Sequence, residues 1–294
     1  MLSGKQILIA LAIKYEGDWD QMYSAISNKE VEDLNPYIEE FNKSTCKAVT
    51  ILDKEYPAIL KQIYMPPFVL FYYGDLSIAY NPSKCLSIIG SRNPSSYGEK
   101  MANDLASKLS NDFVIVSGMA KGVDGIAHRS AITAGNKTIA IIGCGIDRCY
   151  PLENKDLYQS LKTNHLILSE YFGQVSPDTT HFPLRNRIIS GLSDKIIVIN
   201  KDKNANKGLL TFAVGYVNKN GEIVSFKLLS NDSITATYAL SFSRTVLAVP
   251  NRADTNSACN RLIKEGAVLV ENAADVLEEM NNTAFVGSEI QENS

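Results

Sequence analysis

The sequence predicts an α/β protein with a doubly wound, mostly parallel sheet of the extended Rossmann-like type, preceded by a small helical domain. Short β-branched runs such as Leu86–Ile89, Phe113–Val116 and Thr138–Ile142 are separated by stretches of helical length. This alternation is typical of parallel strands joined by crossover helices. All three runs lead into glycine-containing polar turns. Such turns lie at the carboxyl ends of strands, which is where open α/β sheets bind ligands.

The overall composition is that of a soluble globular protein. The 294 residues are 45% hydrophobic and carry a formal net charge of −3, so nucleic-acid binding would need a local basic patch. Five cysteines are scattered without a C-x-x-C pair, which favours reduced thiols in a cytoplasm over a disulfide framework or a metal site. The first apolar run is interrupted by Lys14 and Glu16, too early for a signal peptide or a membrane span. We therefore expect a cytoplasmic protein without membrane contact.

Residues 1–45 form the predicted helical domain. Lys5–Tyr15 has its apolar residues at helical spacing, and shorter helical patterns follow to about Phe41. We interpret this segment as a packing or partner module without chemistry. The aromatic run Phe68–Tyr73 is expected to be a covering strand. Its rings could stack on nucleic-acid bases, but a run this apolar belongs more often to a core.

From residue 86 onward the expected strands and helices alternate. They are the strand Leu86–Ile89, a helix at about Tyr97–Leu109, the strand Phe113–Val116, a helix at about Val123–Ala134, the strand Thr138–Ile142, a helix at about Asn154–Leu161, the strand Leu166–Leu168, a helix from Arg185 and the strand Ile196–Ile199. Parallel strands of one sheet are joined by right-handed crossovers, so the polar turns that follow the strands meet at one edge.

The pattern changes after Ile199. Two extended runs, Phe212–Val217 and Glu222–Leu228, flank an Asn-Gly turn and predict a β-hairpin inserted at residues 202–229. The remaining expected elements are the helix Ile234–Phe242, the strand Val246–Val249, the helix Asn260–Glu265, the strand Ala267–Val270 and the helix Ala273–Met280. The sequence thus predicts one domain over residues 46–283, followed by a disordered tail at 284–294.

The common nucleotide-binding and catalytic motifs are absent from the sequence. Gly143-Cys144-Gly145 has Arg148 at the position of the third glycine of a dinucleotide fingerprint, and no Walker A lysine pattern occurs. No serine nucleophile elbow is present, and the three histidines lack the i, i+4 spacing of metal ligands. We therefore expect no catalytic residues, no metal and no cofactor.

Basic side chains accompany two of the polar turns. Arg92 follows Gly90 and Ser91, whose small size lets an anion approach the backbone amides. A structural ion pair is the alternative role for Arg92. Lys121 and Gly122 directly precede a predicted helix, whose N-terminus adds the positive end of its dipole. We expect Lys121 to bind phosphate.

A second pair of cations lies at a predicted helix start. Arg185 and Arg187 flank Asn186, and with one residue between them they point to different sides of the helix. We expect one of them to face the pocket and the other to brace the loop.

Three further titratable side chains accompany these motifs. Asp124 and His128 are four residues apart on one helical face, a spacing that suits a general acid–base pair. A buried hydrogen bond between them that fixes the loop is the interpretation we favour. Glu170 follows a strand end, and a carboxylate beside phosphate ligands more often orients an arginine than takes part in chemistry.

Taken together, these motifs resemble the bacterial DNA-processing proteins of the DprA or Smf family. The matching segments are Ile89–Arg92, Ile115–Asp124 with Ala127-His128, Gly143–Asp147 with Tyr150-Pro151, Ser169–Tyr171 and Phe182–Ser193, preceded by Tyr56-Pro57 and Pro66–Phe71. The resemblance covers most of the chain.

The resemblance implies a non-enzymatic, single-stranded-DNA-binding protein of natural transformation (competence) and DNA recombination. Such a protein loads the RecA recombinase onto incoming DNA and acts as a homodimer. Carried over, the DNA pocket would comprise Gly90, Ser91, Arg92, Gly118, Lys121, Gly122, Arg185, Asn186 and Arg187. Leu240, Ile263 and Leu269 would be the apolar positions of the dimer and partner surface, or else ordinary core.

The chain departs from the family pattern at several points. Members often have a basic residue directly after Tyr-Pro, where this chain has Leu152, which leaves Lys155 as a substitute phosphate ligand. The family's Ser-Gly-Ser-Leu-Ile-Thr-Ala loop corresponds to Ser230–Ala236, which follows the extra hairpin and has Asn231 in place of the glycine. We also expect no winged-helix domain like the one that many relatives append.

Two other functions compete with DNA binding. One is an enzyme similar to the nucleotide phosphoribohydrolases, with Glu170 or Asp124 as the acid, although the P-G-G-x-G-T-x-x-E signature of those enzymes is absent. The other is an interaction module that kept the fold and lost DNA binding through the insertion.

Overall fold

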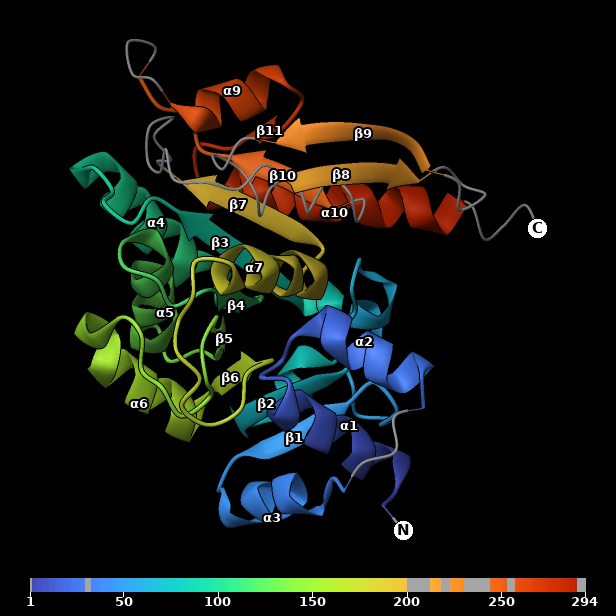
Figure 1. Cartoon of the computed structure of the whole chain (residues 1–294). Coiled ribbons are helices and arrows are strands. Elements are labelled where there is room, and N and C mark those ends of the chain that lie inside the picture. Colours follow the sequence, from blue (N-terminus) through green and yellow to red (C-terminus); the bar gives the residue numbers. More distant parts are fainter. Residues whose placement is uncertain are drawn as a thin grey trace.

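One mixed sheet of nine strands forms the centre of the part of the chain that the structure describes (Figure 1). The computed structural model describes residues 2–29, 33–199, 212–217, 223–229, 244–252 and 257–289. The strands of this sheet are β1 (Lys47–Thr50), β2 (Val69–Gly74), β3 (Cys85–Gly90), β4 (Val114–Ser117), β5 (Thr138–Ile141), β6 (Leu166–Ser169), β7 (Lys195–Ile199), β10 (Thr245–Ala248) and β11 (Val268–Leu269). Their order is β1-β2-β6-β5-β4-β3-β7-β10-β11.

The strand order confirms the doubly wound fold. From β3 the chain moves outward through β4, β5 and β6, and it then returns to the other side of β3 with β7, β10 and β11, all parallel. The order therefore reverses between β3 and β7, and such a switch point opens a crevice at the carboxyl ends of the strands. Strand β2 runs opposite to the other strands of this sheet and pairs antiparallel with both β1 and β6.

Helices cover both faces of the sheet, because both faces of its central strands are apolar. The helices are α1 (Gly4–Lys14), α2 (Trp19–Ser27), α3 (Asn35–Lys43), α4 (Ser96–Leu109), α5 (Val123–Thr133), α6 (Lys155–Asn164), α7 (His181–Leu192), α9 (Ala258–Lys264) and α10 (Ala273–Glu289). In β3, Leu86 and Ile88 share a core cluster with α4, α5 and α10, whereas Cys85 and Ile89 share another with α7. Alternate residues of one strand thus anchor opposite layers.

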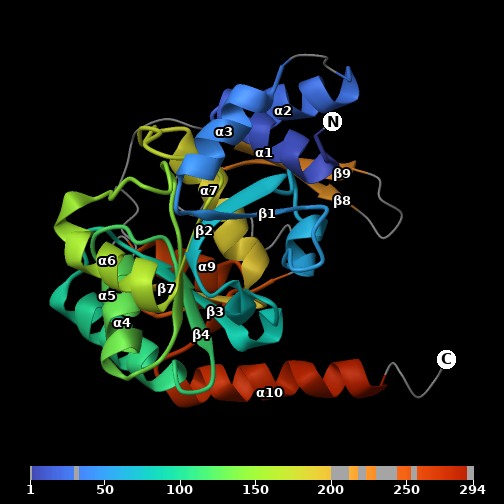
Figure 2. The same cartoon turned by 90° about the horizontal axis from the view of Figure 1, so that it is seen from below.

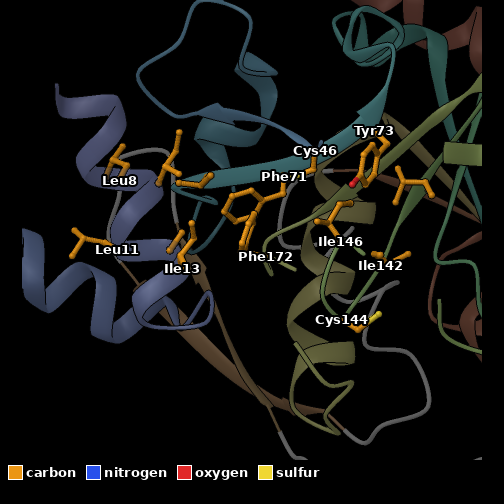
Figure 3. Packing of buried hydrophobic residues seen from close by; sticks show 14 of the residues in the cluster. Leu8, Leu11, Ile13, Cys46, Phe71, Tyr73, Ile142, Cys144, Ile146 and Phe172 are labelled. Carbon is orange, nitrogen blue, oxygen red and sulfur yellow. The ribbon is translucent and has the colours of Figure 1, made fainter. Parts of the chain in front are cut away.

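The N-terminal helices share a core with the sheet. Leu8, Leu11 and Ile13 of α1 pack in the same cluster as Phe71 of β2 and Phe172 (Figure 3). Figure 2 shows these helices on the side of the molecule opposite α10. The buried aromatic run of β2 confirms the core interpretation of that strand.

The predicted boundaries of two helices were wrong. Helix α7 begins at His181, one turn before Arg185. Pro183 is tolerated in the first turn, because the N–H that proline lacks would have no acceptor within the helix at that position. Helix α10 continues past Met280 to Glu289, so part of the segment expected as a disordered tail is helical.

The predicted hairpin is confirmed as the antiparallel pair β8 (Phe212–Val217) and β9 (Ile223–Leu229). Its Asn-Gly turn, the predicted helix Ile234–Phe242, the Ser230–Ala236 loop and residues 290–294 lie outside the described residues. Among the residues that are described, no helix is long and apolar enough to cross a membrane.

Candidate nucleic-acid interface

A pocket of about 240 Å³ lies where β3, β4 and β5 end. Side chains and backbone from the turns after these strands and from the first turns of α7 line it. They are Arg92, Gly118, Ala120, Lys121, Gly143, Cys144, Tyr150, Pro151, Phe182 and Arg185. The structure thus brings the glycine-rich turns to one place, as the parallel strands required, and puts three cations beside two aromatic rings.

The turn after β3 places an exposed guanidinium at the pocket. A side chain at Gly90 would meet the carbonyl oxygen of Ile199 at 2.1 Å, so this position needs glycine. Ser91 is buried, and its carbonyl accepts a hydrogen bond from the Val123 amide at 3.0 Å. Arg92 is exposed, and its guanidinium carbon lies 5.6 Å from the centre of the Phe182 ring, a cation–π contact.

The turn after β4 leads directly into α5. Gly122 has φ +74°, and a Cβ there would meet the Ser91 carbonyl oxygen at 2.3 Å, so both the backbone conformation and the close packing require glycine. Lys121 is exposed beside it. Asp124 in the first turn of α5 accepts a hydrogen bond from the Gly118 amide at 3.2 Å, and burial raises the pKa of its carboxyl. This buried carboxyl fixes the turn that carries Lys121.

Helix α7 supplies a buried cation at the floor of the pocket. Arg185 Nη1 donates to the Gly118 carbonyl oxygen at 2.7 Å and also to the Ile141 carbonyl oxygen, so one guanidinium links the ends of two strands. Its Nε donates to Asn186 Oδ1 at 3.1 Å. A Cβ at Gly118 would lie 2.6 Å from Nη1, which explains the glycine at that position. Asn186 thus orients the arginine that lines the pocket.

Arg187 lies in the interior instead of facing the pocket. Its side chain is 1% exposed, and Nη1 and Nη2 each donate to one carboxylate oxygen of Glu170 at 2.6 Å. Its Nε donates to the Met65 carbonyl oxygen at 2.9 Å. We therefore correct its place in the predicted pocket: Arg187 braces α7, because a guanidinium saturated by these acceptors has no route to an external anion. Glu170 orients an arginine, as the sequence indicated.

The predicted hydrogen bond between Asp124 and His128 was wrong. His128 is fully buried on α5, and its Nδ1 lies 2.7 Å from Thr138 Oγ1. The Thr138 hydroxyl donates to the Ile115 carbonyl oxygen at 2.6 Å, so His128 Nδ1 is the donor to Thr138. The carboxylate of Asp124 turns to the loop amides instead. Neither residue is arranged as half of an acid–base pair.

Sequence reasoning missed Tyr150 and Phe182 as pocket residues. Their rings stack 5.5 Å apart at 30°, and Tyr150 is 41% exposed. The Tyr-Pro dipeptide was the available signal for Tyr150. Phe182 was not recognised, because the helix was expected to begin at Arg185, three residues after Phe182. Lys155, the expected substitute ligand, is exposed at the start of α6 and does not line the pocket.

The described residues offer no group of three or more histidine, cysteine or carboxylate side chains that could hold a metal ion. The five cysteines are unpaired thiols, and burial raises the pKa of Cys144 at the pocket wall to about 11. A protonated, buried thiol is a poor nucleophile.

Comparison with known proteins identifies the family. A family model described as DNA recombination-mediator protein A matches residues 47–227 and 218–281, which is most of the chain. The chain belongs to this DNA recombination-mediator family. The match to the recombination-mediator model begins with β1, so α1–α3 precede it, and its two segments overlap within the β8–β9 hairpin.

Individual members of the DNA recombination-mediator family are similar over most of their length. DNA processing protein DprA of Bacillus subtilis is 35% identical over 269 residues, covering 89% of this chain and 82% of that protein. DprA of Streptococcus pneumoniae is 38% identical over 243 residues, covering 82% and 76%. The X-ray structure of the S. pneumoniae protein has a TM-score of 0.68 at 33% identity and covers 95% of this chain and 93% of its own. A solved structure of DNA processing protein A from Helicobacter pylori has a TM-score of 0.64 at 27% identity and covers 81% of this chain and 98% of its own.

Proposed function

We propose that this member of the family binds single-stranded DNA in the pocket at the ends of β3, β4 and β5 and loads a RecA-type recombinase onto that DNA in natural transformation and recombination. The observation that carries the proposal is the convergence of Arg92, Lys121 and Arg185 on the stacked rings of Tyr150 and Phe182. The similar structure of the H. pylori protein supports the proposal, because that protein is described as having a single-stranded DNA binding mode.

The chemistry of the pocket suits an unpaired strand. Cations contact backbone phosphates without reading sequence, and exposed rings stack on bases of any identity. A cavity of about 240 Å³ is large enough to admit a phosphate or a single base. No sequence-specific donor pattern is needed, which fits a protein that acts on incoming strands of any sequence.

Replacing both exposed cations of the pocket is expected to abolish most of the DNA binding. The double variant Arg92→Ala plus Lys121→Ala removes two charged phosphate contacts, worth roughly 1.5 kcal/mol or more each, so affinity for oligo-dT should fall by about 100-fold. The slope of log affinity against log salt should also become shallower by about 1.4, since each phosphate contact contributes about 0.7. Fluorescence anisotropy of labelled oligo-dT at several salt concentrations measures both.

A matched control removes two positive charges near the amino ends of the strands, away from the pocket. Lys84 directly precedes β3, and Lys108 lies in the last turn of α4, which leads to the start of β4. Both side chains are exposed. Lys84→Ala plus Lys108→Ala should bind oligo-dT like the wild type. If the two double variants weaken binding equally, or if the wild type does not bind DNA, the proposed DNA site is wrong. The pocket then binds another ligand, and nucleotide hydrolysis is the next activity to assay.

We further propose that homodimer formation and the recombinase contact use the edge of the sheet formed by β11. Leu269 lies on β11, the edge strand of the sheet, and its apolar side chain is 46% exposed, so a partner surface can contact it. Ile263 on α9 is half-buried and packs against a core cluster, so it contributes less, and Leu240 lies outside the described residues.

The substitution Leu269→Arg is expected to convert a dimer to a monomer at micromolar concentration, because it places a charge at an apolar interface. Light scattering after gel filtration measures the mass, and an unchanged circular dichroism spectrum confirms the fold. If the variant remains a dimer, the dimer interface does not lie at Leu269. A monomer that still stimulates RecA filament formation would separate the two surfaces.

A further inference from the structure

One of the pocket cations is held by a carboxylate of the protein itself. Lys121 Nζ is in ion-pair contact with Glu153 Oε1, and the two side chains are 50% and 60% exposed. Glu153 lies in η4 (Leu152–Asn154), the short 3-10 helix that directly follows Pro151 of the pocket wall. The hydrogen bond from Lys121 holds the pKa of the Glu153 carboxyl below its ordinary value, so the group is ionised at neutral pH.

The other pocket cations have different partners. Arg92 lies over the Phe182 ring, and Arg185 donates to backbone carbonyls and to the Asn186 amide. Within the described part of the chain, Lys121 is thus the pocket-lining cation that has a carboxylate partner. An incoming phosphate would meet Arg92, whose side chain is exposed, and Lys121, whose charge is already paired.

We propose that Glu153 is an internal competitor of DNA phosphate for Lys121 and thereby sets the DNA affinity of the pocket. This inference rests on the proposed function. A free strand must displace the carboxylate before its phosphate can bind the ammonium group. The exchange is feasible because an ion pair between half-exposed side chains is weak and is screened by salt.

The position of Glu153 suits this role. The preceding residue, Leu152, is 73% exposed and offers no charge, so the Tyr-Pro-Leu-Glu segment presents a carboxylate as its first charged group beside the pocket. A second ion pair lies nearby, between Arg129 of α5 and Asp156 in the first turn of α6, with 2.9 Å between Nη2 and Oδ1. Arg129 does not line the pocket, so Asp156 provides a matched control.

The variant Glu153→Gln is expected to bind oligo-dT about two- to five-fold more tightly than the wild type at low salt, the range set by an exposed ion pair. The gain should shrink as salt rises. In the Lys121→Ala background the same substitution should change affinity little, because the ammonium group that pairs with Glu153 is absent. Asp156→Asn removes the same charge three residues away and should leave affinity close to that of the wild type. Anisotropy titrations of the wild type and these four variants complete the cycle.

The outcomes separate the inference from the proposed function. Two outcomes would overturn the competition: an equal gain in affinity from Glu153→Gln with and without Lys121, or an equal gain from Asp156→Asn. In either case the carboxylates weaken binding by general electrostatic repulsion of the DNA. If the wild type binds oligo-dT and Lys121→Ala weakens it while Glu153→Gln changes nothing, the competition fails and the DNA site stands. A wild type that binds no DNA overturns both. Thermal melting of each variant verifies that these surface substitutions leave the fold intact.

Discussion

Replacing Glu170 by alanine is expected to destabilise the protein by about 3–5 kcal/mol, because it leaves the guanidinium of Arg187 buried without its charge partner. The two side chains are 8% and 1% exposed and share two hydrogen bonds of 2.6 Å. For a chain of this size the loss corresponds to a fall in melting temperature of about 5–8 °C. DNA binding should weaken too, since Arg187 anchors the helix that carries Arg185 and Phe182.

Two comparisons test that explanation. Glu265→Ala breaks the exposed pair with Arg261 on α9 and should cost less than about 1 kcal/mol in the same denaturation assay. The double variant Glu170→Leu plus Arg187→Met replaces the buried pair with apolar groups of similar volume and should be more stable than Glu170→Ala alone. A Glu170→Ala protein as stable as the wild type would contradict the assignment of Arg187 as a buried, charge-dependent brace.

Acidification is expected to destabilise the protein strongly below pH 6.5 because His128 is buried in its neutral form. Burial lowers the pKa of His128 to about 3, against 6.5 for an exposed histidine. Between these values the unfolded chain binds a proton that the folded chain does not, so stability falls as pH falls, by up to about 1.4 kcal/mol per pH unit. The contribution is intact above pH 6.5, and about 2 kcal/mol of it is lost by pH 5.

The variant His128→Gln isolates this contribution. It keeps an amide donor near Thr138 and cannot titrate, so its free energy of unfolding should be lower at pH 7.5 but should change less between pH 7.5 and 5. Urea denaturation at both pH values measures the difference. His165→Gln is the comparison, since burial lowers the pKa of His165 as well, although its side chain is 8% exposed whereas His128 is fully buried. Equal pH dependence in the wild type and His128→Gln would show that the histidine does not cause the acid sensitivity.

Local patterns in the sequence were sufficient to predict the sheet and the end of its strands at which the pocket lies. Runs such as Leu86–Ile89 and the glycines after them are local signals, because strand period and turn conformation depend on neighbouring residues in the chain. Gly90 and Gly122 lie at two of these strand ends and turns, each at a point where backbone approaches backbone. Because parallel strands end at one edge, the convergence of their turns followed from topology alone.

Only the tertiary structure decided which side chains reach the pocket. Arg185 and Arg187 are two residues apart, so a helix must turn them to different sides, but the packing of α7 against the rest of the protein decides which one lines the pocket. His128 bonds to Thr138 on β5 instead of its helical neighbour Asp124, because the adjacent strand offers a closer partner. The pairs Tyr150–Phe182 and Lys121–Glu153 join residues 32 apart in the chain, and contacts at that distance are set by packing, which no local pattern in the sequence encodes.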